Sequence, residues 1–200
     1  MHTQGISSKH FEYSDCLQKI SDAIQKWETT RNSVIKSCKR LEESHKEDNR
    51  LANVQPCFSL PILNELIETR LDTSRKLAIG KYQEKSFDAI DTFNVSTNNL
   101  LSIINALVEN LMNHQSVSSN QLPKIMTIQN ILNSIDSFKT LLINEYDAIR
   151  LYHVKRVFIH SNSFNDLLVS NNTLPDNSPT KLVWCNEFIV QLNTLLDFLI

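Results

Sequence analysis

Glycine is nearly missing from this chain, and its scarcity limits what the chain can fold into. Only Gly5 and Gly80 are glycine among 200 residues, against an average usage of about 7%. Tight hairpins and phosphate-binding loops draw on glycine because it adopts positive φ without steric cost. The sequence therefore predicts an all-α fold, in which helices are joined by polar loops.

The clearest helical signal lies near the N-terminus. Mostly apolar residues recur there at alternating spacings of three and four, which is the a/d seam of a coiled coil. The seam consists of Leu17, Ile20, Ile24, Trp27, Arg31, Val34, Cys38 and Leu41. We predict a heptad helix over 14–46, with Ser14 as its N-cap and a loose polar stretch over 1–13 before it.

Arg31 is the residue that interrupts this seam. A polar residue at an a position lowers stability and helps to select register or partner. In a parallel homodimer Arg31 would face its own copy, and burying two like charges together is costly. We therefore expect the seam to be covered by a different protein, which makes a hetero-oligomer a better prediction than a homo-oligomer. Pairing of the seam within the chain remains the alternative.

Long antiparallel helices are predicted over 59–170. The first begins near Ser59 with Pro61 in its first turn, where a missing N–H does no harm. Its apolar stripe is blurred near Gly80 and resumes from residue 90 to residue 111, so we expect one helix with a weak point there. A second helix follows Pro123, after a polar loop over 113–122, and a short helical turn is predicted over 164–169.

The C-terminal part is predicted as a linker over 171–180 and an amphipathic helix over 181–200. The wide apolar face of this helix must pack on the rest of the chain or on a partner. With the seam residues, its predicted partner-binding residues are Trp184, Phe188, Leu192 and Leu195. Trp27 and Trp184 are the expected anchors, because large aromatics recur at binding hot spots. The whole is predicted to be an elongated helical hairpin or coiled-coil bundle of about four helices.

The sequence offers no residue constellation for catalysis. It has no Walker A loop, no nucleophile elbow and no H-E-x-x-H pair. His153 and His160 are seven residues apart, but two imidazoles without carboxylates make a poor metal site. We expect no enzymatic activity, no cofactor and no metal.

Charge and hydropathy limit the partners and the compartment. A net charge of −2 and a pI near 6.3 give no basic surface for nucleic acid. No apolar run approaches the ~20 residues of a membrane span, and the N-terminus is polar. We therefore expect protein partners, no membrane span and no secretion, in a nuclear or cytoplasmic protein.

Ser178 is a candidate phosphorylation site. The run Ser178-Pro179-Thr180-Lys181 matches the substrate pattern of cyclin-dependent kinases and lies just before the last predicted helix. A phosphate there would meet the free N–H groups of that helix. The alternative is an ordinary linker with a Ser or Thr that caps the helix.

The run Lys26-Trp27-Glu28-Thr29 in the first helix resembles the cyclin-dependent kinase 2-interacting protein family. The order of elements is also similar, with an aromatic–basic stretch from Glu145 to Val157 and a Trp-containing segment around Trp184. The resemblance implies a non-catalytic nuclear adaptor linked to DNA replication and checkpoint signalling. It also implies a place in a complex around AAA ATPases that acts in ribosome maturation.

A different function is compatible with the same helical pattern. Kinetochore, tethering and autophagy scaffolds also contain helical chains that are poor in glycine and rich in asparagine and serine. The sequence therefore leaves two hypotheses, an adaptor of a nuclear complex and a coiled-coil structural subunit of such a scaffold.

Overall fold

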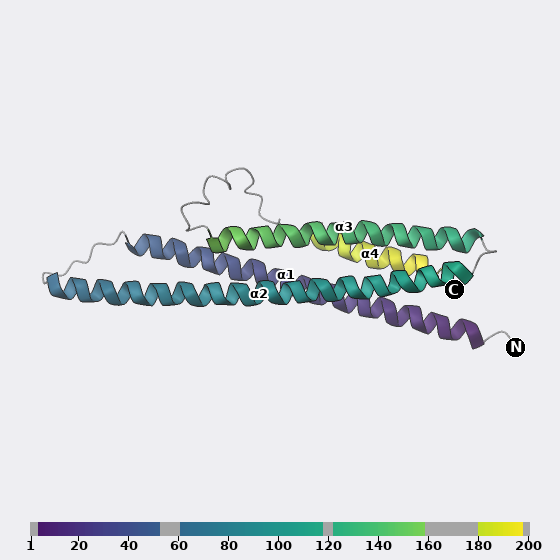
Figure 1. Cartoon of the computed structure of the whole chain (residues 1–200), viewed down its shortest axis with the longest axis horizontal. Helices are drawn as coiled ribbons and strands as arrows, with labels where there is room; N and C mark the ends of the chain where they lie inside the picture. Colours follow the sequence, from purple (N-terminus) through teal and green to yellow (C-terminus); the bar gives the residue numbers. More distant parts are fainter. Residues whose placement is uncertain (1–3, 53–60, 118–121, 159–179, 198–200) are drawn as a thin grey trace. The chain divides into compact units, whose positions relative to one another are not determined.

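The chain forms four α-helices in the part that its computed structural model describes, residues 4–52, 61–117, 122–158 and 180–197 (Figure 1). These are α1 (Gln4–Ala52), α2 (Pro61–Val117), α3 (Leu122–Phe158) and α4 (Thr180–Asp197). They pack as a bundle, with α1 and α2 in contact. The prediction of an all-α fold with about four helices is confirmed.

The helices contribute to two compact units. Unit 1 comprises residues 1–29, 94–148 and 173–200, and unit 2 comprises residues 30–93 and 149–172. Unit 1 thus contains parts of all four described helices, whereas unit 2 contains parts of α1, α2 and α3.

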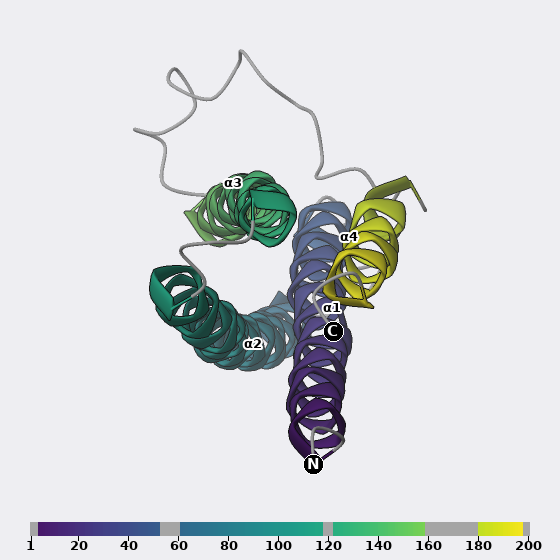
Figure 2. The ribbon, with the colours of Figure 1, turned by 90° about the vertical axis from the view of Figure 1, so that its right-hand side faces the viewer.

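The core of unit 1 is built from one apolar stripe of each helix. In it α4 lies against α1 and α3 (Figure 2). The buried apolar residues are Ile20, Ala23, Ile24 and Trp27 of α1, Leu100, Ile104, Leu107 and Leu111 of α2, Ile128, Ile131, Ile135, Phe138 and Leu142 of α3, and Cys185, Phe188, Leu192 and Leu196 of α4. They recur at spacings of three and four because such residues share one face of a helix.

The core of unit 2 is smaller and contains more polar groups. Its buried apolar residues are Val34, Ile35, Cys38 and Leu41 of α1, Ala89, Ile90 and Phe93 of α2, and Ile149, Tyr152 and Val157 of α3. Arg31, Ser86 and His153 are buried beside them. In this unit α1 and α2 run antiparallel (Figure 1). Asp48 Oδ1, near the end of α1, lies 4.0 Å from Arg75 Nε, in the first part of α2.

The first helix is longer at both ends than predicted. It begins at Gln4 and ends at Ala52, so the expectation of a loose stretch over 1–13 is wrong from residue 4 onward, and Ser14 lies inside the helix instead of capping it. The charged run after residue 41 continues the helix because ion pairs one turn apart support it. Lys46 contacts Glu42 at 2.8 Å, and Arg50 contacts Glu47 at 2.8 Å.

The second helix is continuous through Gly80, as predicted. It extends to Val117, so the polar loop expected over 113–122 is shorter than predicted. The third helix begins at Leu122, with Pro123 in its first turn. The helical turn predicted over 164–169, most of the linker over 171–180, and Ser178 lie outside the described residues.

Gly80 offers a direct test of the weak point in α2. A Cβ at this position would meet no atom within 4 Å, and glycine in a helix interior costs about 1 kcal/mol relative to alanine. We expect Gly80→Ala to raise the free energy of unfolding by up to ~1 kcal/mol, measured by urea titration with circular dichroism. The exposed neighbour Ala78 supplies the control, because Ala78→Gly should lower stability by a similar amount. A loss of stability in Gly80→Ala would contradict this reading of the helix.

None of the described helices is both long and apolar enough to cross a membrane.

Candidate protein-binding surfaces

The predicted coiled-coil seam of α1 is covered by the chain itself. From Ile20 to Leu41 every seam residue is buried, and Leu17 is half-buried. Pairing within the chain, the alternative that the sequence left open, is what the structure shows. The expectation that another protein covers this seam is corrected, because its side chains from Ile20 to Leu41 are buried by the chain itself. Arg31 is also buried, and its Nη1 donates a hydrogen bond of 3.2 Å to Asn32 Oδ1.

Aromatic side chains hold α1, α3 and α4 together in unit 1. The ring of Trp27 meets that of Trp184 edge to face, with centroids 6.1 Å apart. Trp184 lies 5.1 Å from Phe138, which in turn stacks on Phe188 at 3.9 Å. Trp27 Nε1 donates a hydrogen bond of 3.0 Å to Thr97 Oγ1 on α2. The two tryptophans predicted as anchors therefore anchor the chain's own core.

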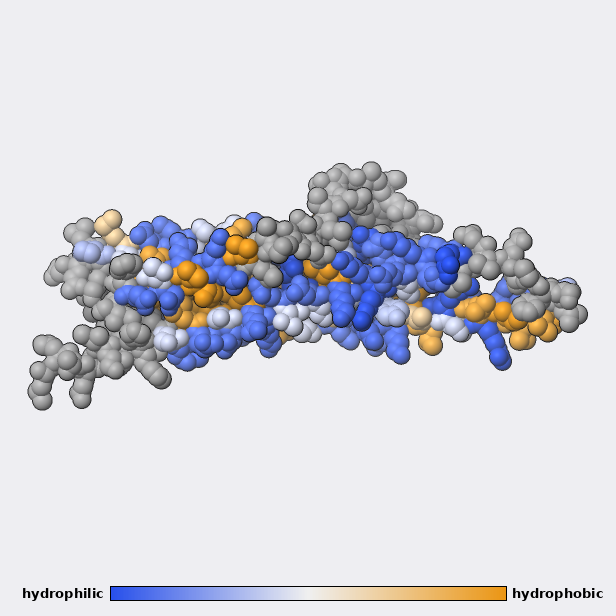
Figure 3. Space-filling view, turned by 180° about the vertical axis from the view of Figure 1, so that it is seen from behind, coloured by the Kyte–Doolittle hydropathy of each residue, from blue (hydrophilic) through white to orange (hydrophobic). Residues whose placement is uncertain are grey.

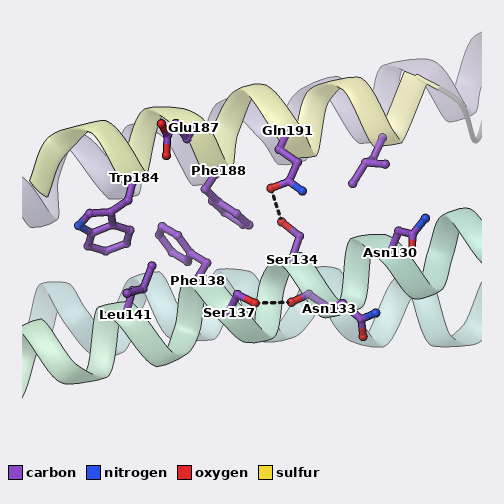
Figure 4. Close-up of a pocket in the computed structure, with 11 residues that line it drawn as sticks. Asn130, Asn133, Ser134, Ser137, Phe138, Leu141, Trp184, Glu187, Phe188 and Gln191 are labelled. Carbon is purple, nitrogen blue, oxygen red and sulfur yellow. Dashed lines mark hydrogen bonds between the residues drawn. The ribbon is translucent and has the colours of Figure 1, made fainter. Parts of the chain in front are cut away.

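A groove lies between α3 and α4 beside this aromatic cluster (Figure 4). Its volume is about 510 Å³, within the range of ~300–1,000 Å³ that is usual for ligand sites. We call it the α3/α4 groove. It is lined by Asn130, Asn133, Ser134, Ser137, Phe138 and Leu141 of α3, and by Trp184, Glu187, Phe188, Gln191 and Leu195 of α4.

The lining of the α3/α4 groove divides into an apolar and a polar part. Phe138, Leu141 and Trp184 gather toward one end, and the amide and hydroxyl groups gather toward the other (Figure 4). Ser134 donates a hydrogen bond of 3.0 Å to Gln191 Oε1 across the groove. Carboxamides both donate and accept, so they can bond the main chain of a peptide. Glu187 is the charged residue among those lining the groove.

Only part of the predicted partner-binding set comes together here. Trp184, Phe188 and Leu195 line the groove, whereas Leu192 is fully buried in the core. The polar wall from α3 was missed by the sequence analysis. Its members Asn130, Ser134 and Ser137 recur at helical spacing beside the apolar stripe. In the sequence this pattern is typical of a solvent-exposed helix face, and only the position of α4 makes it part of a groove.

Unit 2 carries a different surface at the start of α2. Large aliphatic side chains are exposed there. They are Ile62 and four members of the apolar stripe expected before Gly80, namely Leu63, Leu66, Leu71 and Leu77, whereas Ile67 of that stripe is half-buried. Figure 3 shows apolar surface over this first part of α2. Scattered single apolar residues need no explanation, whereas clustered exposed apolar side chains are typical of interaction surfaces.

A buried serine–histidine contact in unit 2 resembles part of a catalytic arrangement. Ser86 Oγ and His153 Nε2 share a hydrogen bond of 2.8 Å, which is the distance of a nucleophile from its base. However, Ser86 is 0% and His153 4% exposed, so neither can meet a substrate in this arrangement. The pair is best interpreted as a polar contact inside the core.

Burial shifts the pKa values of two ionisable groups in the core of unit 2. Burial lowers the pKa of His153, an effect opposed by a hydrogen bond to the backbone of Ser86 and by the carboxylate of Asp91. Burial also raises the pKa of Cys38 to about 12, so its thiol stays protonated. Arg156 contacts Glu42 at 3.2 Å and lies 5.4 Å from the centre of the Tyr152 ring.

Among the described residues no group of three or more His, Cys, Asp or Glu side chains is placed to hold a metal ion. No protein-family model, no curated protein and no solved structure matches the chain.

Proposed function

We propose that the chain is a non-catalytic helical adaptor subunit of a multiprotein complex. The observation that carries this proposal is the lining of the α3/α4 groove, in which the apolar part lies beside the polar part with its carboxamides. Such a lining suits a segment of another protein that places an apolar side chain against Trp184 and Leu141. The main chain of that segment would bond the amides, and a Lys or Arg would lie near Glu187.

The complex we propose is nuclear, and acts in replication and checkpoint signalling or with an AAA ATPase in ribosome maturation. Support for this part comes from the sequence alone, through the resemblance of Lys26-Trp27-Glu28-Thr29 and the order of the helices. The function proposed for the groove does not depend on the nuclear assignment.

A second candidate is a coiled-coil structural subunit of a kinetochore, tethering or autophagy scaffold. The lengths of α1 and α2 favour it, since they contain 49 and 57 residues against a mean of about 11–12 for helices in globular proteins. Long helices are suited to spacing the other members of a scaffold.

Affinity purification of the full chain followed by mass spectrometry separates these possibilities. Leu141 lines the groove and is 46% exposed, whereas Ile143 is 44% exposed on the same helix and does not line it. We expect Leu141→Glu to reduce recovery of the direct partner about tenfold or more, because a carboxylate would be buried in the apolar end of the groove. Ile143→Glu is the matched control and should recover the partner normally.

The outcome decides both the site and the complex. Equal recovery by the two variants would contradict the groove as a partner site. An AAA ATPase or replication factors among the recovered proteins would favour the adaptor, and centromere or vesicle-tether subunits would favour the scaffold. Circular dichroism of both variants checks that the helices are retained.

A further inference from the structure

In the first five turns of α2, most of the large exposed aliphatic side chains lie on the side that faces away from the core of unit 2. Ile62, Leu66 and Leu77 are 81%, 56% and 76% exposed. The side of α2 that faces the core is marked by Arg75, which lies near Asp48 of α1, and further along by buried Ser86. At 100° per residue the two sides lie roughly 160° apart around the helix axis.

Before Gly80 only some of the apolar residues of α2 lie on the core side, among them the half-buried Ile67 and Ile79. Beyond Gly80, Ile90 and Phe93 are buried in the core of unit 2. The exposed residues before Gly80 are therefore not a frayed continuation of the core stripe. They form a separate amphipathic face, which we call the outer face of α2 and define by Ile62, Leu63, Leu66, Arg70 and Leu77.

Arg70 is the charged residue of this outer face. It is exposed and lies seven residues from both Leu63 and Leu77, so it occupies the middle of the stripe. Among the described residues Arg70 has no ion pair. Its charged neighbours point elsewhere, since Lys76 contacts Asp72 at 2.7 Å and Arg75 lies 4.0 Å from Asp48.

We infer that the outer face of α2 binds one amphipathic helix of another protein, which places an Asp or Glu opposite Arg70. Leucine-type side chains of that helix would cover Leu63, Leu66 and Leu77, as in other helix-on-helix recognition. The inference extends the proposed adaptor function, because an adaptor requires a second site besides the α3/α4 groove. The face spans 16 residues from Ile62 to Leu77, or about 24 Å of helix.

Charge decides between another protein and a second copy of this chain. In a symmetric pair centred on the outer face, Arg70 would approach the Arg70 of the other copy. Two like charges brought together in an apolar contact are costly. A carboxylate opposite Arg70 instead gives an ion pair that also fixes the register of the two helices.

Two synthetic peptides test this chemistry on the full chain. Both are amphipathic helices of three heptads with leucine at the a and d positions, and they differ only in Glu or Lys at the central a position. Fluorescence anisotropy of labelled peptides should show the Glu peptide binding about tenfold or more tightly than the Lys peptide. Arg70→Glu should reverse that preference, because it exchanges attraction and repulsion at one place.

Matched variants separate the outer face from the rest of the chain. Leu66→Glu should weaken the binding of the Glu peptide about 30-fold or more, the loss typical of a hot-spot residue. Val95 is exposed on the same helix but outside this face, so Val95→Glu should bind normally. Leu141→Glu in the α3/α4 groove should also bind normally, so that failure of this inference and failure of the proposed function can be told apart.

Four results would overturn the inference. The first is equal binding of the two peptides, and the second is unchanged binding by Leu66→Glu. The third is a light-scattering mass of twice 23.0 kDa that Leu66→Glu returns to one chain, which would show a second copy on this face. The fourth is a fall in the melting temperature of Leu66→Glu as large as that of a core variant, which would show that the chain itself covers the face.

Discussion

Trp27→Ala is expected to lower the free energy of unfolding by about 3–5 kcal/mol, the range for removing a buried Trp or Phe. Trp27 is 2% exposed, and its ring meets Trp184 of α4. Its Nε1 also donates a hydrogen bond to Thr97 of α2. The substitution therefore leaves a cavity and removes a contact to each of two helices. Urea unfolding followed by circular dichroism measures the loss.

Milder substitutions separate the ring from its hydrogen bond. Trp27→Phe keeps most of the apolar volume but removes the N–H, so we expect a smaller loss of about 1–3 kcal/mol. Thr97→Val removes the hydroxyl that accepts the hydrogen bond from the buried indole N–H of Trp27. We expect a similar loss in the free energy of unfolding. A loss below about 1 kcal/mol in Trp27→Ala would contradict the assignment of Trp27 to the core.

Fluorescence adds an independent measurement, because the chain has only two tryptophans. In Trp27→Ala all indole emission comes from Trp184. We expect the emission maximum of Trp184 to lie at longer wavelength in Trp27→Ala than in Trp27→Phe, since alanine cannot fill the contact that holds α4. Equal emission from these two variants would show that α4 is held without Trp27.

The helices and most core positions could be predicted from the sequence, because local periodicity specifies them. Ile20 to Leu41 of α1 and Ile90 to Leu111 of α2 are buried at the spacings of three and four that the sequence shows. A helix buries one stripe whatever covers it, so the pattern predicts burial without indicating the covering partner. For this reason the sequence does not indicate that α2 and other helices of the same chain cover the seam of α1.

The candidate surfaces depend on contacts between distant parts of the chain, which periodicity does not contain. The α3/α4 groove exists because Phe138 stacks on Phe188, fifty residues away in the sequence. Trp184 was predicted as an anchor from its size alone, and its neighbours Trp27 and Phe138 could not be read from spacing. The outer face of α2 was visible as an apolar stripe, but only the structure shows that this stripe points away from the core.

The buried contact between Ser86 and His153 was equally invisible in the sequence, and it predicts how stability responds to pH. Burial holds the pKa of His153 in the folded chain below its ordinary value, whereas the unfolded histidine titrates near 6.5. Between these two pKa values the unfolded chain binds more protons than the folded chain. The contribution of His153 is therefore fully present above about pH 6.5 and is lost as the pH falls toward the folded pKa.

We expect the free energy of unfolding of the wild type to fall more steeply between pH 7 and pH 5 than that of His153→Gln. The difference is up to about 1.4 kcal/mol for each pH unit within the window, because one proton is involved. Glutamine does not titrate and can still bond Ser86, so it isolates the charge from the hydrogen bond. Urea unfolding at a series of pH values measures both curves, and parallel curves would contradict the prediction.

Ser86→Ala tests the other half of the same contact. It removes the partner of His153 Nε2 while both positions stay buried, so we expect a loss of about 1–3 kcal/mol at pH 7.5. The backbone of Ser86, which the substitution keeps, opposes the effect of burial on the pKa of His153. The dependence of stability on pH that His153 gives should therefore be retained in Ser86→Ala, with the whole curve displaced to lower stability. Loss of that pH dependence in Ser86→Ala would contradict the assignment of the pKa effect to burial and to the backbone of Ser86.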